Sequence, residues 1–145
     1  MILKNIDHLF EKPHMTAALD GEYFNLWPTM PHFNSGCLVI EPNQELYNDI
    51  LNFAKNIKIS DLPDTIIADQ DILNFYYSDW YSKPELHLDK WYNIFGPYIL
   101  AEQDQEVKEN CYFIHFIGRK PWVAWNKHPE ENYSEVSYQL AVEMI

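Results

Sequence analysis

Three short clusters contain the residues whose types and spacing suit chemistry. They are Asn34-Ser35-Gly36, Asp69-Gln70 and residues 115–122, which include His115, Gly118, Arg119 and Lys120. In the last cluster a neutral imidazole can offer a nitrogen to a metal ion, and two cations beside a glycine can bind an oxyanion such as phosphate. The same segment also fits a core strand with a hydrogen-bonded histidine and a solvated basic turn.

The other two clusters also allow two interpretations each. The amide of Asn34 suits sugar hydroxyls if it stands at the mouth of a strand, but in a turn it would bond only to its own backbone. Asp69 could accept hydrogen bonds from hydroxyls, with Gln70 facing an electrophilic carbon. Alternatively, Asp69 is a helix cap that favours the helix dipole. Each cluster taken singly leaves both interpretations open.

Strand and helix patterns alternate along the chain and must position these clusters. Apolar runs predict strands at residues 2–3, 15–19, 33–40, 91–95 and 112–117. Apolar residues at helical spacing predict helices after Asn43, which we expect to be an N-cap, and at residues 66–77 and 133–145. The helix after Asn43 should be a packing helix. Residues 20–32 should be a loop, residues 78–90 a loop with one turn of helix, and residues 98–110 a solvated acidic face. This interleaving predicts an α/β fold.

Composition restricts the compartment and the partners. The 145 residues are enough for one domain with a real core, and the net charge of −12 disfavours an extended nucleic-acid surface. Cys37 and Cys111 each lie in an apolar run, which favours reduced thiols in the cytoplasm. No apolar run reaches the roughly 18 residues of a membrane span, and the N-terminus lacks a signal-peptide pattern. We expect a cytoplasmic protein with no nucleic-acid partner and no membrane span.

Taken together and in this order, the three clusters resemble the glycogenin-like retaining glycosyltransferases of glycosyltransferase family 8. The matching segments are residues 33–36 (FNSG), 68–74 (ADQDILN) and 115–122 (HFIGRKPW), with weaker support from residues 5–10 (NIDHLF) and 91–93 (WYN). The resemblance covers about residues 1–125. It implies the C-terminal, acceptor-side part of a GT-A type nucleotide-diphospho-sugar transferase fold, with a mixed sheet and flanking helices.

The resemblance also implies a site for a divalent metal ion, Mn²⁺ or Mg²⁺, and for a UDP-sugar donor. His115 would be a metal ligand, and Gly118 and Lys120 would hold the diphosphate. A divalent ion and a lysine would stabilise the negative charge that develops on departing UDP while the sugar gains oxocarbenium character.

The remaining matched residues would serve the sugar. Asn34 and Ser35 would bind the donor, Asp69 would hold the sugar, and Gln70 would lie next to the anomeric carbon. Retention of configuration requires a nucleophile below the ring or attack from the side of the leaving group, and the residues leave both routes open.

One departure from the family pattern concerns the metal. The family's Asp-x-Asp motif lies just before the segment matched by residues 2–10, so it would precede Met1. A single imidazole is a poor site for manganese or magnesium, which prefer several oxygen ligands. We therefore expect residues 1–145 to be an N-terminally truncated glycosyltransferase domain that is inactive without a missing N-terminal half.

The expected function is that of a metal-dependent retaining hexosyltransferase. It would move a hexose, taken as glucose by analogy with glycogenin, from a UDP-sugar to a glycan or protein acceptor. The alternative is a non-catalytic derivative of the fold that binds a glycan or a protein.

Overall fold

The computed structural model describes residues 1–21, 31–58, 68–96 and 105–116. The strands are β1 (Thr16–Leu19), β2 (Phe33–Val39), β3 (His87–Leu88), β4 (Ile94–Phe95) and β5 (Ile114–His115). The α-helices are α1 (Gln44–Asn56), α2 (Asp69–Tyr76) and α4 (Gln105–Asn110). The 3₁₀ helices are η1 (Asp7–Glu11), η3 (Trp80–Ser82), η4 (Pro84–Leu86) and η5 (Lys90–Tyr92).

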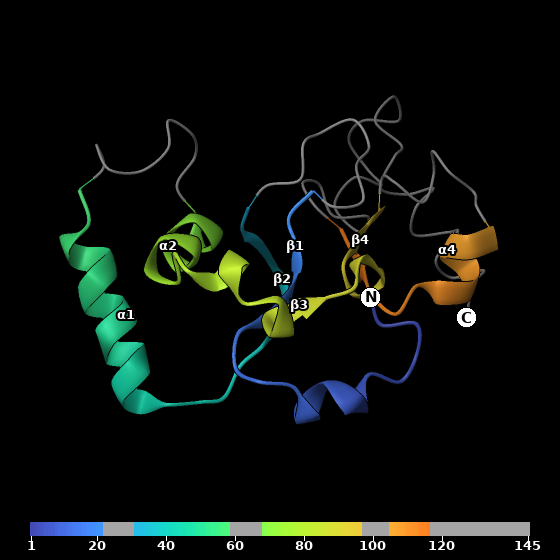
Figure 1. Cartoon of the computed structure of the whole chain (residues 1–145), viewed down its shortest axis with the longest axis horizontal. Coiled ribbons are helices and arrows are strands. Elements are labelled where there is room, and N and C mark those ends of the chain that lie inside the picture. The colour runs from blue at the N-terminus through green and yellow to red at the C-terminus, as the bar shows by residue number, and fades with distance from the viewer. Residues whose placement is uncertain (22–30, 59–67, 97–104, 117–145) are drawn as a thin grey trace, which may run out of the picture.

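The strands form two small sheets with helices on either side (Figure 1). In the first, β1 lies between β2 and β3 and pairs antiparallel with β2 and parallel with β3. In the second, β4 pairs parallel with β5, and Ile2 forms an antiparallel bridge to Phe113. The predicted α/β fold with a mixed sheet and flanking helices is confirmed.

A large bulge interrupts the pairing of β2 with β1. Thr16 pairs with Val39 and Ala17 with Leu38, but the next pair joins Leu19 to Phe33. Between the last two pairs β1 has one residue, whereas β2 has four, residues 34–37. Bulges redirect side chains and are common beside functional sites. The bulge therefore lifts the cluster Asn34-Ser35-Gly36 out of the regular ladder.

The indole of Trp80 organises the core beneath β1 and β2. Trp80 is 1% exposed and packs edge to face on Phe33, with ring centroids 5.2 Å apart. Its Nε1 donates a hydrogen bond to the carbonyl oxygen of Met15 at 2.8 Å. Met15 has a φ of 64°, uncommon for a residue with a side chain, and its N–H also donates to Val39 at 2.7 Å. A residue of η3 thus fixes the entry to β1.

Two further buried clusters join the other elements. One surrounds β4 and β5 and consists of Ile94, Val107, Cys111, Ile114 and Phe116. The other joins η1, β1 and β3 through Leu9, Ala18 and Leu88. Val107 places α4 against the second sheet, so the acidic segment predicted as a solvated face has one buried anchor at 1% exposure.

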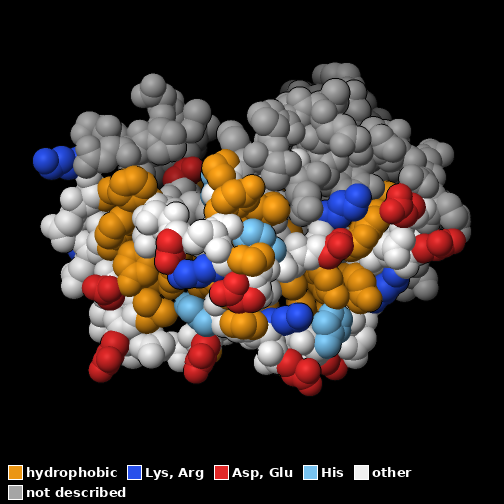
Figure 2. Space-filling model, in the orientation of Figure 1, with side chains coloured by type: hydrophobic (Ala, Val, Ile, Leu, Met, Phe, Trp, Pro, Cys, Tyr) orange, Lys and Arg blue, Asp and Glu red, His pale blue; other side chains and the backbone are white. Residues whose placement is uncertain are grey.

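The predicted N-cap of α1 is confirmed, and the helix packs against α2 without burying any of its residues fully. Asn43 Oδ1 accepts a hydrogen bond from Leu46 N at 2.9 Å, yet α1 contains no buried residue. The helix packs against α2 through Phe53, whose ring centroid lies 5.2 Å from that of Tyr76. A cleft of about 490 Å³ separates α1 from β2, and hydrophobic side chains gather over α1 and α2 on the surface (Figure 2).

The segment at residues 78–90, predicted as a loop with one turn of helix, contains the two 3₁₀ helices η3 and η4 and also the strand β3. The predicted strand at residues 91–95 is confirmed only for β4, because Asp89 Oδ1 accepts a hydrogen bond from Trp91 N at 3.0 Å and caps η5. The helix expected at residues 66–77 begins at Asp69 among the described residues. The helix expected at residues 133–145 lies outside them, as does most of the loop at residues 20–32.

Both cysteines are free thiols, as predicted. Burial raises the pKa of Cys111 to about 11 and also raises the pKa of Cys37. No described helix has the length and apolarity needed to cross a membrane.

The buried thiol of Cys111 should resist alkylation in the folded chain. Since the thiolate is the nucleophile, a pKa of about 11 leaves a very small reactive fraction at pH 8, and burial blocks access to it. Mass spectrometry after iodoacetamide treatment should find Cys111 labelled only when denaturant is added. Rapid labelling in buffer alone would contradict this placement.

Replacing Trp80 by Phe should lower the free energy of unfolding by about 1–3 kcal/mol, because the buried Met15 carbonyl loses its donor and the smaller ring leaves a void. Tyr81→Ala on the same 3₁₀ helix is the matched control. Tyr81 is 50% exposed, so its replacement should change stability by about 0.5 kcal/mol or less. Urea unfolding followed by circular dichroism measures both variants, and equal losses would contradict the packing described.

Candidate functional site

The side chain of Asn34 is buried at the start of the bulge in β2. Its Nδ2 donates to Asp20 Oδ1 at 2.9 Å. Its Oδ1 accepts from Gly36 N at 2.9 Å and from Asn93 Nδ2 at 2.8 Å. The amide therefore bonds to its own backbone, as the turn interpretation predicts, and it also joins two other segments.

Gln70, in the first turn of α2, meets the same bulge. Its Oε1 accepts a hydrogen bond from Ser35 N at 3.0 Å, and its Nε2 donates to Asp20 Oδ2 at 3.0 Å. One turn later, the amide of Asn74 donates to Phe33 O and accepts from Phe33 N, both at 2.9 Å. The side chains of α2 thus bind the backbone of β2 directly, and the first two predicted clusters lie together.

Asp20 joins these two clusters and was not among the predicted site residues. It follows β1 directly, and its two carboxylate oxygens accept from Asn34 and Gln70. His32 Nε2 lies 3.6 Å from Asp20 Oδ2. An aspartate followed by a glycine at the end of a strand is typical of a turn, so the sequence carried only the signal of a turn residue.

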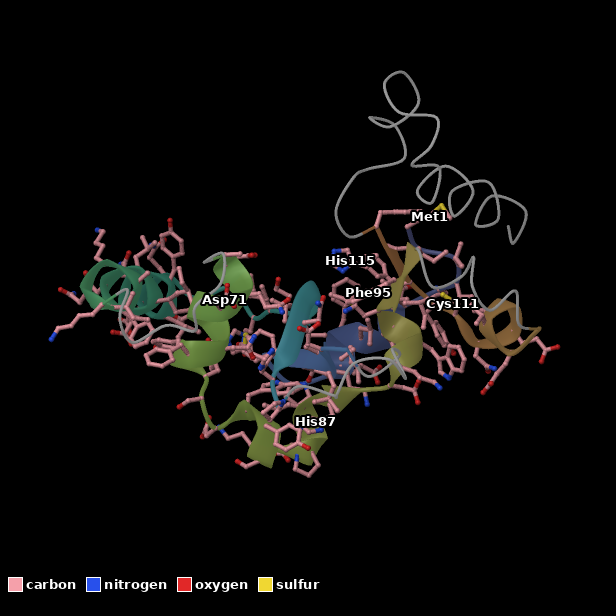
Figure 3. The ribbon with its side chains drawn as sticks, turned by 90° about the horizontal axis from the view of Figure 1, so that it is seen from above. Met1, Asp71, His87, Phe95, Cys111 and His115 are labelled. Carbon is pink, nitrogen blue, oxygen red and sulfur yellow. The ribbon has the colours of Figure 1, made fainter. Side chains whose placement is uncertain are left out.

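His115, the predicted metal ligand, lies against the same bulge from β5. A Cβ atom added to Gly36 would lie 2.2 Å from His115 Nδ1 and 2.4 Å from its Cε1, so the ring rests on the bare glycine backbone. Figure 3 shows His115 beside Phe95, whose ring is perpendicular to the imidazole at 5.6 Å between centroids. The third cluster therefore joins the first two at its histidine.

Asp69 is exposed in the first turn of α2. The hydrogen bond that caps the start of the helix comes from Asp71, whose Oδ2 accepts from Ala68 N at 2.9 Å. Asp69 is thus placed where an acidic side chain favours the helix dipole. Gly118 and Lys120 lie outside the described residues.

The described residues do not form a complete site for the metal ion that the family resemblance implies. No group of three His, Cys, Asp or Glu side chains in residues 1–21, 31–58, 68–96 and 105–116 is placed to hold a metal ion. One imidazole with amide neighbours does not provide the several oxygen ligands that manganese or magnesium prefers.

Replacing Gly36 by Ala should displace the ring of His115, because a Cβ there would overlap Nδ1 and Cε1 and lie 2.8 Å from Asn34 Oδ1. Overpacking of this kind costs about 1–3 kcal/mol of stability. Ser35→Ala, one position earlier, is the control and should leave the imidazole in place. Chemical shifts of the His115 ring protons report the displacement, and unchanged shifts in Gly36→Ala would contradict the contact.

The chain is similar to several curated glycosyltransferases. Glycogenin-1 of Mus musculus is 35% identical over 126 residues, which cover 84% of this chain and 34% of that protein. The putative UDP-glucuronate:xylan alpha-glucuronosyltransferase 5 of Arabidopsis thaliana is 32% identical over 123 residues, which cover 84% of this chain and 19% of that protein. Galactinol synthase 2 of Solanum lycopersicum is 27% identical over 171 residues, which cover 97% of this chain and 47% of that protein.

The chain thus spans about a third of the length of glycogenin-1 and less than half of the galactinol synthase. The sequence profile described as glycosyl transferase family 8 matches residues 22–126, which include all three clusters of the site up to Trp122. This chain therefore belongs to glycosyltransferase family 8.

Proposed function

We propose that this chain supplies the sugar-binding and diphosphate-binding part of a retaining glycosyltransferase that uses a UDP-sugar. The observation that supports this most directly is the meeting of Asn34, Gln70 and His115, from three separate segments, at the bulge in β2. Family membership supports the class of reaction, and this convergence supports the proposed position of the donor site.

The two amides suit sugar hydroxyls because each retains hydrogen-bonding capacity. A side-chain amide has two N–H donors and an oxygen with two lone pairs. Within the described residues, Asn34 uses both lone pairs and one N–H, whereas Gln70 uses one lone pair and one N–H. We propose that the remaining groups, with the hydroxyl of Ser35, bind the donor sugar.

The diphosphate would lie at the exit of β5. Gly118 and Lys120 follow His115 by three and five residues in the sequence. A cation held there offsets the charge that develops on departing UDP. His115 would contribute one metal ligand.

Asp69 and Gln70 are the proposed catalytic residues. When configuration is retained, the acceptor attacks from the side that the leaving group departs. The opposite face of the anomeric carbon then needs either a nucleophile or a group that stabilises the oxocarbenium ion electrostatically. The carbonyl of Gln70 already accepts from Ser35 N, which fixes its direction, and the exposed carboxylate of Asp69 lies one residue away. We propose a hexose as the transferred group, glucose by analogy with glycogenin, and a glycan or protein as acceptor.

A second candidate, a non-catalytic glycan-binding or protein-binding derivative, is favoured by one observation. The described residues do not form a group of metal ligands. The two candidates differ in their affinity for UDP in the presence of manganese, which only the first requires.

Calorimetry of the purified chain with UDP and manganese chloride tests the proposal. The wild type should bind, and both His115→Ala and Lys120→Ala should weaken binding about tenfold, because each removes an interaction with a charged group. Lys83→Ala is the matched control, since Lys83 pairs with Asp79 at 2.7 Å on the surface and should have no effect on affinity. Absence of UDP binding by the wild type would contradict the proposal and favour the non-catalytic derivative.

A further inference from the structure

We propose that Asp20 is a positioning residue whose carboxylate holds the amides of Asn34 and Gln70 in the orientation in which they meet the donor sugar. This inference rests on the proposed function. Asp20 would act through the two amides, because its two oxygens are already engaged by them.

The backbone fixes Asp20 at the end of β1. Its N–H donates to His32 O at 3.0 Å, which closes the base of the loop that follows. Gly21 then turns the chain away with a φ of 72°, a conformation that glycine adopts readily. The side chain of Asp20 is 22% exposed, so most of its carboxylate surface is covered. The carboxylate therefore stands at a defined point between β2 and α2.

The direction of both amides follows from partners that can only donate. Backbone N–H groups of Ser35 and Gly36 must find oxygens, and these are Gln70 Oε1 and Asn34 Oδ1. The NH₂ group of each amide therefore faces Asp20, and an ionised carboxylate can only accept. All four hydrogen bonds agree on a single arrangement, which removes the usual ambiguity between oxygen and nitrogen in side-chain amides.

An aspartate is the residue that satisfies this arrangement. An asparagine of the same shape would offer one oxygen and one NH₂, so one of the two amides would face another donor. Gln70 and Asn34 could not both rotate to compensate, because each oxygen is needed by a backbone N–H. In Asp20→Asn, one amide should therefore lose its fixed direction while the fold stays assembled through Phe33, Trp80 and Asn74.

Comparing UDP with UDP-glucose in Asp20→Asn separates positioning from general damage. Asp20 acts on groups proposed to bind the sugar, so the affinity for UDP should stay unchanged. The affinity for UDP-glucose should fall about tenfold, because an amide that is no longer held in place loses its hydrogen bond to the sugar. Asp71→Asn is the matched control: it makes the same chemical change on α2, at a carboxylate that caps the helix, and should leave both affinities unchanged.

Side-chain amide resonances test the same claim without ligand. In a ¹⁵N spectrum of the free chain, the NH₂ protons bound to Asp20 should move upfield in Asp20→Asn for Asn34 or Gln70, and should not move in Asp71→Asn. Unmoved resonances, or equal loss of UDP and UDP-glucose affinity, would overturn the assignment. If the wild type binds neither nucleotide, the proposed function fails, and the resonances alone decide whether Asp20 orients the amides.

Discussion

The side-chain amide oxygen of Asn34, Oδ1, accepts two hydrogen bonds, and the arrangement of the site depends on both. One comes from Gly36 N and shapes the bulge in β2, and the other comes from Asn93, immediately before β4. Asn34 and Asn93 are each 6% exposed, so a donor that lost this oxygen would be buried without water to replace it. Because β4 pairs with β5, the same oxygen connects the bulge to the strand that carries His115.

Neutral amides do most of the connecting in this site. Asn34 and Gln70 each donate to a side chain and accept from a backbone N–H, and Asn74 donates to and accepts from backbone groups. Asn93 donates to Asn34 Oδ1. A carboxylate can only accept, and it suits the one place where two NH₂ groups converge, at Asp20. In a chain with a net charge of −12, amides bring polar groups together without adding further negative charge.

The sequence was informative wherever the signal was local. The N-cap at Asn43, the strand at Thr16–Leu19 and the helix containing Gln70 follow from spacing and capping chemistry, and the structure confirms them. The role of Asp20 could not be predicted in this way, because it depends on residues 14 and 50 positions away. Strand β3 has two residues, too few to produce a periodic pattern in the sequence, and it forms by pairing with β1.

The incomplete burial of α1 could not be predicted for a different reason. Periodicity indicates which face of a helix is apolar, but burial depends on what covers that face. In the described structure the apolar face of α1 borders a cleft, with Tyr47 57% exposed. Contiguous apolar surface of this kind is costly to leave in water.

The antiparallel bridge between Ile2 and Phe113 also constrains the order in which the chain can fold. Leu3 N donates to Tyr112 O at 2.9 Å and Ile114 N donates to Met1 O at 2.8 Å, so the two ends of the described chain pair directly. Contacts so distant in sequence form slowly, because the entropy of closing the intervening loop must be lost first. During synthesis residues 1–3 cannot form this pairing until residues 112–114 have left the ribosome. The strand that carries His115 is therefore among the last parts of the site to reach its native pairing.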